Sequence, residues 1–372
     1  MRRRVLFVAR TRYRLPLAPG LARKWEALAG LADVRVLAAA APGSARSDGV
    51  FSLARPLGRP ALDGPAFYLL LPLRVARELR RFRPDAVVAQ SPYEGAAVLV
   101  ARALVRSRAK LVLDVHGDWR TFTRLYGSRL RRLLDPLADR IGDAVVRAAD
   151  GVRTVSGYTT SLVRAQGVEP AGLFPAYMEL DTFLDRPPAP LPERPRALFV
   201  GVLERYKNVD GLAAAWRRVA QEIPNATLHL VGTGTLTRVA SALVEELPGR
   251  VDWDESLPAE GVARALDAAT ALVLPSRSEG MGRVLVEALC RGRPVVGARV
   301  GGIPDVVEDG VSGLLVPPGD IAALAAALVR VLSDGGLAAR LAEGAAAAAP
   351  RWTVSAEEFA ARQVELVEHV LA

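Results

Sequence analysis

The chain has 372 residues, of which 51% are hydrophobic, 24% charged and 6% aromatic, and this length predicts two domains that each bury a core. The composition excludes a disordered chain, and no run of about 18 uncharged apolar residues occurs, so no membrane-spanning helix is expected. The net charge of +9 is uneven, because residues 1–185 carry 30 Lys and Arg against 17 Asp and Glu, whereas residues 186–372 carry 19 against 23. The single cysteine, Cys290, excludes an internal disulfide and is typical of a reducing, cytoplasmic location.

Strands and helices are predicted to alternate through the first half of the chain. Strands are expected at residues 3–9, 34–39, 85–89, 110–115 and 151–155, and helices at about 20–30, 65–81, 95–105 and 129–149. Pro72 falls inside the second of these helices, where a proline is expected to kink or break it. Five prolines between residues 186 and 195 then predict a stiff connector and the boundary between the two domains.

The alternation restarts after this proline-rich connector. Strands are expected at residues 196–200, 226–231, 250–253, 270–274 and 294–298, and helices at 208–221, 236–247, 260–269, 322–332 and 353–371. Such alternation predicts α/β domains with parallel sheets, in which ligands bind beyond the carboxyl ends of the strands. We therefore expect Rossmann-like domains at residues 1–185 and 196–352 that face each other across a cleft, with the last helix, within residues 353–372, crossing back to the first domain.

Residues 275–289 carry the clearest chemistry of the sequence. They follow a predicted strand, pass through a loop with Gly280 and Gly282, and continue as a helix. Glycines let a backbone lie close to a ligand, and a helix start offers unpaired N–H groups and a positive dipole end to a diphosphate. Glu279 in the loop and Glu287 in the helix suit hydroxyl groups such as those of a ribose. Phosphate, ribose and sugar hydroxyls together describe a nucleotide sugar.

With these residues the sequence resembles the family-four group of retaining glycosyltransferases, the glycosyl transferases group 1, which have the GT-B fold. The matching runs are residues 199–208, 230–234, 275–289, 292–296, 301–307 and 309–320. The resemblance implies that the second domain holds a nucleotide sugar and that the basic first domain binds the acceptor.

The resemblance assigns roles at the donor site to individual residues of the second domain. Glu287 matches the glutamate that binds the ribose, Glu279 the one that faces the donor sugar, and Lys207 the lysine that neutralises the leaving diphosphate. Gly232 lies in the matching run 230–234. The backbone amides implied to contact the sugar hydroxyls and the diphosphate belong to Gly280, Met281, Gly282, Arg283, Val284 and Leu285.

One position departs from the family pattern. The family usually has an arginine directly after the motif glycine, and Val202 stands there in this chain. Arg205 lies nearby and is a candidate replacement at the phosphate. The alternative is that phosphate binding depends more on Lys207 and on the helix start.

The first domain contributes fewer candidates. His116 matches the family histidine that reaches the donor sugar near the anomeric carbon, and a structural histidine is the alternative. Gly20 matches the glycine loop that approaches the phosphates, although the family often has two glycines where this chain has Pro-Gly. Glu94 and Tyr93 are candidates for the acceptor site, with a plain surface glutamate as the alternative for Glu94. Ser156 follows a strand at the expected cleft, and a helix N-cap explains it equally well.

The predicted activity is metal-independent, retaining glycosyl transfer, of the hexosyltransferase class, from a nucleotide-diphosphate sugar to a hydroxyl of a glycan, lipid-linked glycan or cell-envelope glycan. No metal or other cofactor is expected, because members of the resembled family usually need none. A nucleotide-sugar epimerase with the same fold and a non-catalytic nucleotide-sugar-binding protein remain alternatives. The base of the nucleotide, the donor sugar and the linkage depend on contacts that these motifs do not specify.

The basic first half also predicts contact with an anionic membrane surface. Arginines crowd one short helical stretch, at positions 74, 77, 80, 81 and 83. A solvated, arginine-rich surface is the alternative. Nucleic acid is not an expected partner, because basic residues are not interleaved with aromatic ones.

Overall fold

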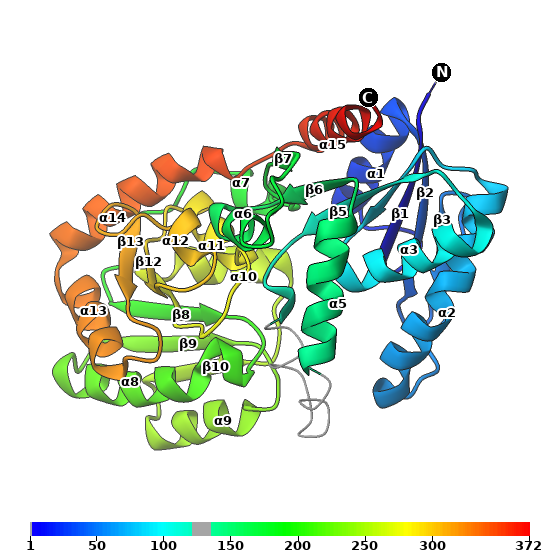
Figure 1. Ribbon diagram of the computed structural model, residues 1–372. Coiled ribbons are helices and arrows are strands. Elements are labelled where there is room, and N and C mark those ends of the chain that lie inside the picture. Colours follow the sequence, from blue (N-terminus) through cyan, green and yellow to red (C-terminus); the bar gives the residue numbers. More distant parts are fainter. Residues whose placement is uncertain (1, 121–134) are drawn as a thin grey trace. The chain divides into compact units, whose positions relative to one another are not determined.

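The computed structural model describes residues 2–120 and 135–372, and the chain divides by its internal contacts into two units (Figure 1). Unit 1 comprises Met1–Tyr177 and Val354–Ala372, and unit 2 comprises Met178–Thr353. Each unit contains one parallel β-sheet accompanied by helices, so the predicted α/β class is confirmed.

The sheet of unit 1 has the strand order β3-β2-β1-β4-β5-β6-β7, and all neighbouring strands are parallel. The strands are β1 (Arg4–Tyr13), β2 (Asp33–Ala40), β3 (Phe51–Ala54), β4 (Ala86–Ala89), β5 (Lys110–Val115), β6 (Gly151–Thr154) and β7 (Gly172–Leu173). The two edge strands, β3 and β7, were not predicted. The direction of chain progression reverses between β1 and β4, which makes this pair the topological switch point of the sheet.

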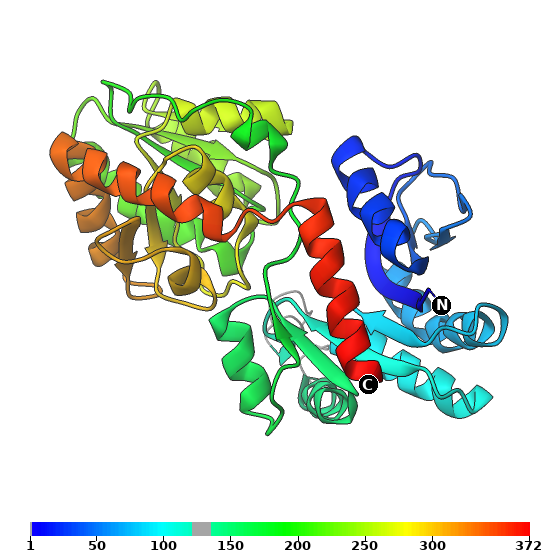
Figure 2. The ribbon, with the colours of Figure 1, turned by 90° about the horizontal axis from the view of Figure 1, so that it is seen from above.

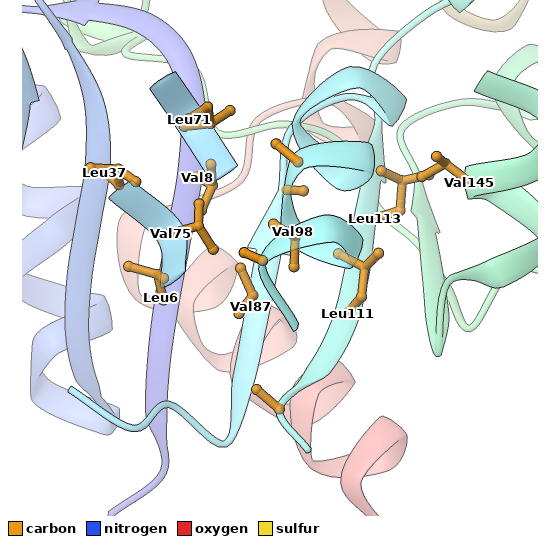
Figure 3. Close-up of a cluster of buried hydrophobic side chains, with 14 of the residues drawn as sticks. Leu6, Val8, Leu37, Leu71, Val75, Val87, Val98, Leu111, Leu113 and Val145 are labelled. Carbon is orange, nitrogen blue, oxygen red and sulfur yellow. The ribbon is translucent and has the colours of Figure 1, made fainter. Parts of the chain in front are cut away.

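Helices cover both faces of this sheet. They are α1 (Pro19–Leu31), α2 (Pro60–Arg81), α3 (Pro92–Val105), α5 (Asp135–Ala148), α6 (Gly157–Arg164) and α15 (Ala356–Leu371). Successive residues of a strand point to opposite faces, so Leu6 and Val8 of β1 pack with α2, α3 and α5 in one core cluster (Figure 3). Val5 and Phe7 pack in a second cluster with α1 and α15, and α15 contacts α1 directly (Figure 2).

Helix α2 corrects one prediction. It is a continuous helix of 22 residues that includes both Pro65 and Pro72, so Pro72 does not end it. Its buried residues Leu71 and Val75 belong to the core cluster on both sides of that proline, and this packing keeps the segment helical. The predicted helix at 129–149 is described from Asp135 to Ala148, and the start of the prediction lies outside the described residues.

The sheet of unit 2 has the order β10-β9-β8-β11-β12-β13, again all parallel. Its strands are β8 (Arg196–Val200), β9 (Thr227–Val231), β10 (Val251–Asp254), β11 (Ala271–Leu274), β12 (Val295–Ala298) and β13 (Gly313–Val316). Its α-helices are α7 (Asp181–Leu184), α8 (Val209–Glu222), α9 (Thr237–Glu246), α10 (Ala259–Asp267), α11 (Arg283–Cys290), α12 (Ile303–Val306), α13 (Ile321–Ser333) and α14 (Gly335–Ala348). β13, α12 and α14 were not predicted. The order in which successive strands are added across the sheet reverses between β8 and β11, so these strands form the switch point of unit 2.

The proline-rich segment at 186–195 lies within unit 2. Arg291 and Arg293 are fully buried, and their guanidinium groups donate hydrogen bonds of 2.7–3.2 Å to backbone carbonyls of residues 186–190. These contacts hold the segment on unit 2, and the observed division of the chain falls after Tyr177 rather than at the prolines.

No single helix of the described residues is long and apolar enough to cross a membrane. The segments Ile321–Ser333 and Gly335–Arg351 meet the length and composition criteria only as a pair, and they are bent by 97° relative to each other. Helices α13 and α14 both bury apolar residues in unit 2.

Candidate functional site

The switch point of unit 2 brings two loops together at the carboxyl edge of the sheet. The loop after β8 contains a 3₁₀ turn, η2 (Arg205–Lys207), and the loop after β11 spans residues 275–282. Arg277 joins the two loops, because its backbone N–H donates to the carbonyl of Tyr206 at 2.6 Å and its Nη1 donates to the carbonyl of Arg205 at 3.1 Å. Its Nη2 contacts Asp210 at 3.1 Å. Sequence reasoning missed this arginine, although it lies inside the 275–289 stretch.

The two joined loops place Lys207 and Glu279 in contact. The Lys207 Nζ donates to Glu279 Oε2, and the two side chains are only 11% and 13% exposed. Ser276 lies 3.4 Å from the same carboxylate oxygen. Residues 72 positions apart therefore form one ion pair, and a partly buried pair of this kind is screened less by solvent than a surface pair.

Glycines determine how closely the loop after β11 approaches the neighbouring backbone. A Cβ added at Gly302 would lie 1.8 Å from the carbonyl oxygen of Gly280, and one added at Gly301 would lie 1.9 Å from that of Glu279. A Cβ at Gly232 would lie 1.9 Å from the carbonyl oxygen of Gly201. Only glycine fits such contacts with backbone atoms, so these glycines set the shape of the site.

Helix α11 begins directly after Gly282, which has φ +76° at the N-cap position. Met281 and Leu285 are buried, so only their backbones are available to a ligand. The amide of Leu285 donates to the carbonyl of Gly282 at 3.0 Å. Val284 is half-buried, and its amide lies in the first turn of the helix.

Glu287 lies one turn into α11 and is 7% exposed. Arg283 donates to it from Nε at 2.6 Å and from Nη2 to the carbonyl of Glu179 at 3.0 Å. Burial raises the pKa of Glu287, and the charge of Arg283 opposes that rise. The guanidinium group of Arg283 thus holds the carboxylate of Glu287 in place.

The position of the missing arginine is open to solvent. Val202 is 45% exposed. Glu204, two residues further along, accepts hydrogen bonds from the N–H of Thr235 at 3.0 Å and from the Thr235 hydroxyl at 2.6 Å. Arg205 is exposed, and among the described residues its guanidinium has no hydrogen-bonding or ionic partner. The cation of Arg205 is therefore available to a ligand.

The switch point of unit 1 is built from side chains. Glu94 follows β4 and is 3% exposed, so the alternative of a surface glutamate is wrong. It accepts hydrogen bonds from the hydroxyl of Tyr68 on α2 at 3.0 Å and from that of Ser91. Burial raises its pKa to about 7, and Tyr68 and Arg10 oppose the rise. Tyr93 donates from its hydroxyl to the carbonyl of Trp119 at 3.0 Å.

His116 follows β5 in unit 1 and is exposed. Its Nε2 lies 3.7 Å from Asp114 Oδ2, which in turn lies 3.1 Å from Nη1 of the fully buried Arg153. Burial alone would raise the pKa of Asp114, but Arg153 and His116 bring it to about 2. Burial lowers the pKa of Lys24 on α1 to about 8, against the opposing charge of Asp114. The signal for Asp114 was present in the sequence, since residues i and i+2 of a strand share a face.

Three further sequence features have structural explanations. Ser156 caps α6 by accepting a hydrogen bond from the N–H of Thr159, as the N-cap alternative predicted. Gly20 is buried in α1, and its carbonyl accepts from the Tyr177 hydroxyl at 2.9 Å. Cys290 is buried, and burial raises its pKa to about 11, which makes it a poor nucleophile.

Comparisons with known proteins find glycosyltransferases. A family model described as glycosyl transferases group 1 matches residues 194–334, and a model described as glycosyl transferase 4-like domain matches residues 17–175. The sulfoquinovosyl transferase SQD2 of Arabidopsis thaliana is 27% identical over 303 residues, covering 76% of this chain and 57% of that protein. The alpha-D-kanosaminyltransferase of Streptomyces kanamyceticus is 28% identical over 293 residues, covering 75% of this chain and 76% of that protein. The chain thus spans between about half and three quarters of the length of these relatives.

Solved structures share the fold over the whole chain. The sucrose-phosphate synthase from Thermosynechococcus elongatus has a TM-score of 0.79 at 22% identity and covers 99% of both chains. The Alr3699/HepE protein of Anabaena, solved in complex with UDP-glucose, has a TM-score of 0.68 at 19% identity and covers 97% of this chain and 99% of its own. At these identities the likeness describes the fold.

Proposed function

Because the chain belongs to the group 1 glycosyltransferases with the GT-B fold, we propose that it transfers a sugar from a nucleotide-diphosphate sugar to an acceptor hydroxyl, with retention of the anomeric configuration. The observation that carries this proposal is the contact between Lys207 and Glu279 at the switch point of the unit 2 sheet, where ligands of such sheets bind.

Each part of the donor has a matching group in unit 2. The ribose hydroxyls pair with the buried carboxylate of Glu287, which Arg283 holds in place. The diphosphate pairs with Lys207, with the exposed cation of Arg205 and with the start of α11. The sugar hydroxyls pair with Glu279. UDP-glucose in the HepE structure supports a donor of this class.

In the proposed reaction the bond between the anomeric carbon and the diphosphate oxygen breaks as the bond to the acceptor oxygen forms on the same face of the sugar. The proton of the acceptor hydroxyl moves to the leaving diphosphate. Negative charge therefore grows on the diphosphate in the transition state, and Lys207 is positioned to stabilise it. The pairing of Lys207 with Glu279 orients the ammonium group before the donor arrives.

We propose that this charge stabilisation needs no divalent metal. Lys207, Arg205 and the first turn of α11 supply positive charge where a metal would otherwise neutralise the diphosphate. The turnover rate measured after treatment with EDTA should equal the untreated rate. A loss of activity that Mg²⁺ or Mn²⁺ restores would contradict the proposal.

Unit 1 is the proposed acceptor-binding part. Its switch point presents Tyr93, the buried Glu94 and the cations of β1, and these polar groups suit a glycan or a lipid-linked glycan. His116, exposed after β5, is proposed to act at the donor sugar.

The test is incubation of the full-length protein with a panel of nucleotide-diphosphate sugars. A transferase is expected to release the sugar slowly by hydrolysis of one donor and to gain thermal stability from it, and the Glu279→Gln variant should lose the hydrolysis. Conversion of one nucleotide sugar into another would identify an epimerase instead. Stabilisation by a nucleotide sugar without turnover, with or without added acceptors, would identify a binding protein.

A further inference from the structure

The outer face of α2 has an unusual composition. Its exposed side chains, among those that the structure describes, are Leu62, Pro65, Leu69, Leu70, Leu73, Arg77, Arg80 and Arg81. Leu69 is 78% exposed and Leu73 is 63% exposed, the two largest values among the large apolar side chains described. A helix buried in its own protein on one side normally carries mixed charges on the other, so apolar and cationic residues alone require an explanation.

The spacing places these residues on one stripe. Leu62, Leu69, Leu73 and Arg80 recur at intervals of seven, four and seven residues, which returns close to the same side of an α-helix. The leucines occupy the first two thirds of the helix, and the arginines occupy its last turns.

The acidic residues of α2 do not reach this face. Asp63 pairs with Arg12 at 3.4 Å and accepts a hydrogen bond from the N–H of Leu57 at 2.7 Å. Glu78 is 9% exposed and pairs with Arg35 at 2.9 Å. Among the described side chains, no exposed carboxylate on α2 opposes the arginines.

The neighbouring helix α3 extends the same surface. It packs against α2, and its exposed residues are Val100, Ala103 and Leu104. Its one acidic residue, Glu94, is buried beside Tyr68. The described exposed side chains of the two packed helices are thus apolar, apart from the arginines of α2.

An arginine-lined cavity opens beside α2. It has a volume of about 100 Å³, and its lining includes Arg10, Arg12, Arg55, Arg74, Phe67 and Leu70. Asp63, already paired with Arg12, is the acidic group of the lining. Arg55 and Arg74 have no hydrogen-bonding or ionic partner among the described residues, so an anion entering the cavity would meet two free cations.

We propose that the α2–α3 face docks on a lipid bilayer with anionic headgroups, and that the cavity receives a headgroup phosphate. Leucines on such a face bury in the boundary between headgroups and acyl chains, and arginines bind the negative surface. Charge complementarity selects this partner over a neutral apolar surface, which would leave the arginines unpaired. The inference is independent of the proposed function, because it depends on unit 1 alone.

The test is flotation of the full-length protein with vesicles of phosphatidylglycerol mixed with phosphatidylcholine. We expect binding that falls with added salt and is absent on vesicles of phosphatidylcholine alone. The double variant Leu69→Glu, Leu73→Glu should bind at least about ten-fold more weakly, because each leucine loses its apolar burial. The triple variant Arg77→Gln, Arg80→Gln, Arg81→Gln should lose about 100-fold, at about five-fold for each arginine.

Matched controls lie on unit 2. Leu184 is 51% exposed, and Arg218 is exposed on α8, so Leu184→Glu and Arg218→Gln make the same chemical changes elsewhere and should bind as the unchanged protein does. Donor hydrolysis without vesicles tests the proposed function separately, and it should be unchanged in Leu69→Glu, Leu73→Glu.

Three results would overturn the inference. The first is equal vesicle binding by the leucine double variant and the unchanged protein. The second is binding of inorganic phosphate without any binding to anionic vesicles. The third is a dimer, measured by light scattering, that the leucine variant converts to a monomer while vesicle binding persists, because the face would then belong to a second copy of the chain.

Discussion

The two sheets have the same kind of switch point, at which the order of successive strands across the sheet reverses. The residues that form the two switch points differ. In unit 2 the loops of the site are shaped by glycines, which let backbone segments approach within a distance that no Cβ allows, and the ion pair between Lys207 and Glu279 joins two of these loops. In unit 1 the corresponding place is filled by side chains, where Glu94 is buried under the hydroxyl of Tyr68 from a different helix.

This difference explains why the residues of the unit 2 site could be predicted from the sequence, whereas the contact of Glu94 with Tyr68 in unit 1 could not. A site formed by backbone atoms needs glycines at fixed positions in short runs of sequence. Residues 275–289 and 301–302 contain such glycines, so the sequence indicates the site. The Glu94 site is assembled from α2, α3 and β1, and nothing in the local sequence of Tyr68 distinguishes it from an ordinary core tyrosine. We expect the two sites to respond differently to substitution.

The largest effect should come from the ion pair of unit 2. Lys207→Ala should lower the turnover of the donor by about a hundred- to a thousand-fold, because it removes the cation that faces the developing charge. Glu279→Ala should cause a loss of the same order, and the double variant should lose little more, since paired groups act as a unit. Steady-state kinetics of the three variants measures this, with Arg218→Ala on the surface of α8 as the control. Independent, multiplicative losses would contradict the pairing.

The next effect concerns the buried Glu94 of unit 1, which should make the free energy of unfolding depend on pH. The pKa of Glu94 is raised from 4.5 to about 7, so the folded state binds its proton more tightly, and the stability this contributes is complete below 4.5 and lost as the pH rises through 7. The loss amounts to about 3 kcal/mol across that window. Urea unfolding of Glu94→Gln, which cannot ionise, should lack this decline.

Tyr68→Phe provides the matched change for this pH dependence. The Tyr68 hydroxyl lowers the pKa of Glu94 by donating to it, so its removal should move the decline in stability to higher pH. A shift to lower pH, or equal pH dependence of Glu94→Gln and the unchanged protein, would mean that Glu94 is solvated in the native state.

A smaller effect should follow from adding a methyl group behind the donor loop. Gly302→Ala places a Cβ against the backbone carbonyl of Gly280, which cannot move aside as a side chain would, and should cost about 2 kcal/mol of unfolding free energy. It should also raise the KM for the donor, because the displaced loop carries Glu279. Gly335→Ala is the control, since nothing lies within 4 Å of its added Cβ. Equal thermal stability of the two variants would contradict the backbone account.

Much of the fold followed from periodicity, and the failures have physical causes. The missed strands β3, β7 and β13 all lie at sheet edges, and β7 has only two residues, too few to show a pattern. Pro72 was expected to kink or break α2; the break is wrong, because the buried residues Leu71 and Val75 hold the helix on both sides of the proline, and the kink stays a prediction. The proline-rich segment was predicted to separate the domains, and the buried guanidinium groups of Arg291 and Arg293 instead hold it on unit 2.

The candidate site was predictable where motif and geometry coincide. Lys207 and Glu279 were named from separate motifs, and the structure brings them into contact. Arg277, which joins their loops, and Asp114, which lies beside His116, were not found, because each acts on another residue rather than on a ligand. The sequence places Arg277 in the 275–289 stretch and Asp114 two residues before His116, but it does not show which residue each of them contacts.

The smallest effect concerns the departure at Val202. Val202→Arg restores the family's cation at a position that is 45% exposed, and an exposed ion pair contributes only up to about 1 kcal/mol, so the KM for the donor should fall about two- to five-fold. Val311→Arg is the matched control, because Val311 is also 45% exposed in unit 2. If Arg205 binds the phosphate in the unchanged protein, Arg205→Gln should raise KM by a similar factor. That effect should shrink once an arginine stands at 202, since two cations that serve one phosphate substitute for each other. An undiminished effect of Arg205→Gln in the Val202→Arg background would show that the two positions act on different groups, and that phosphate binding in unit 2 depends on Lys207 and the start of α11.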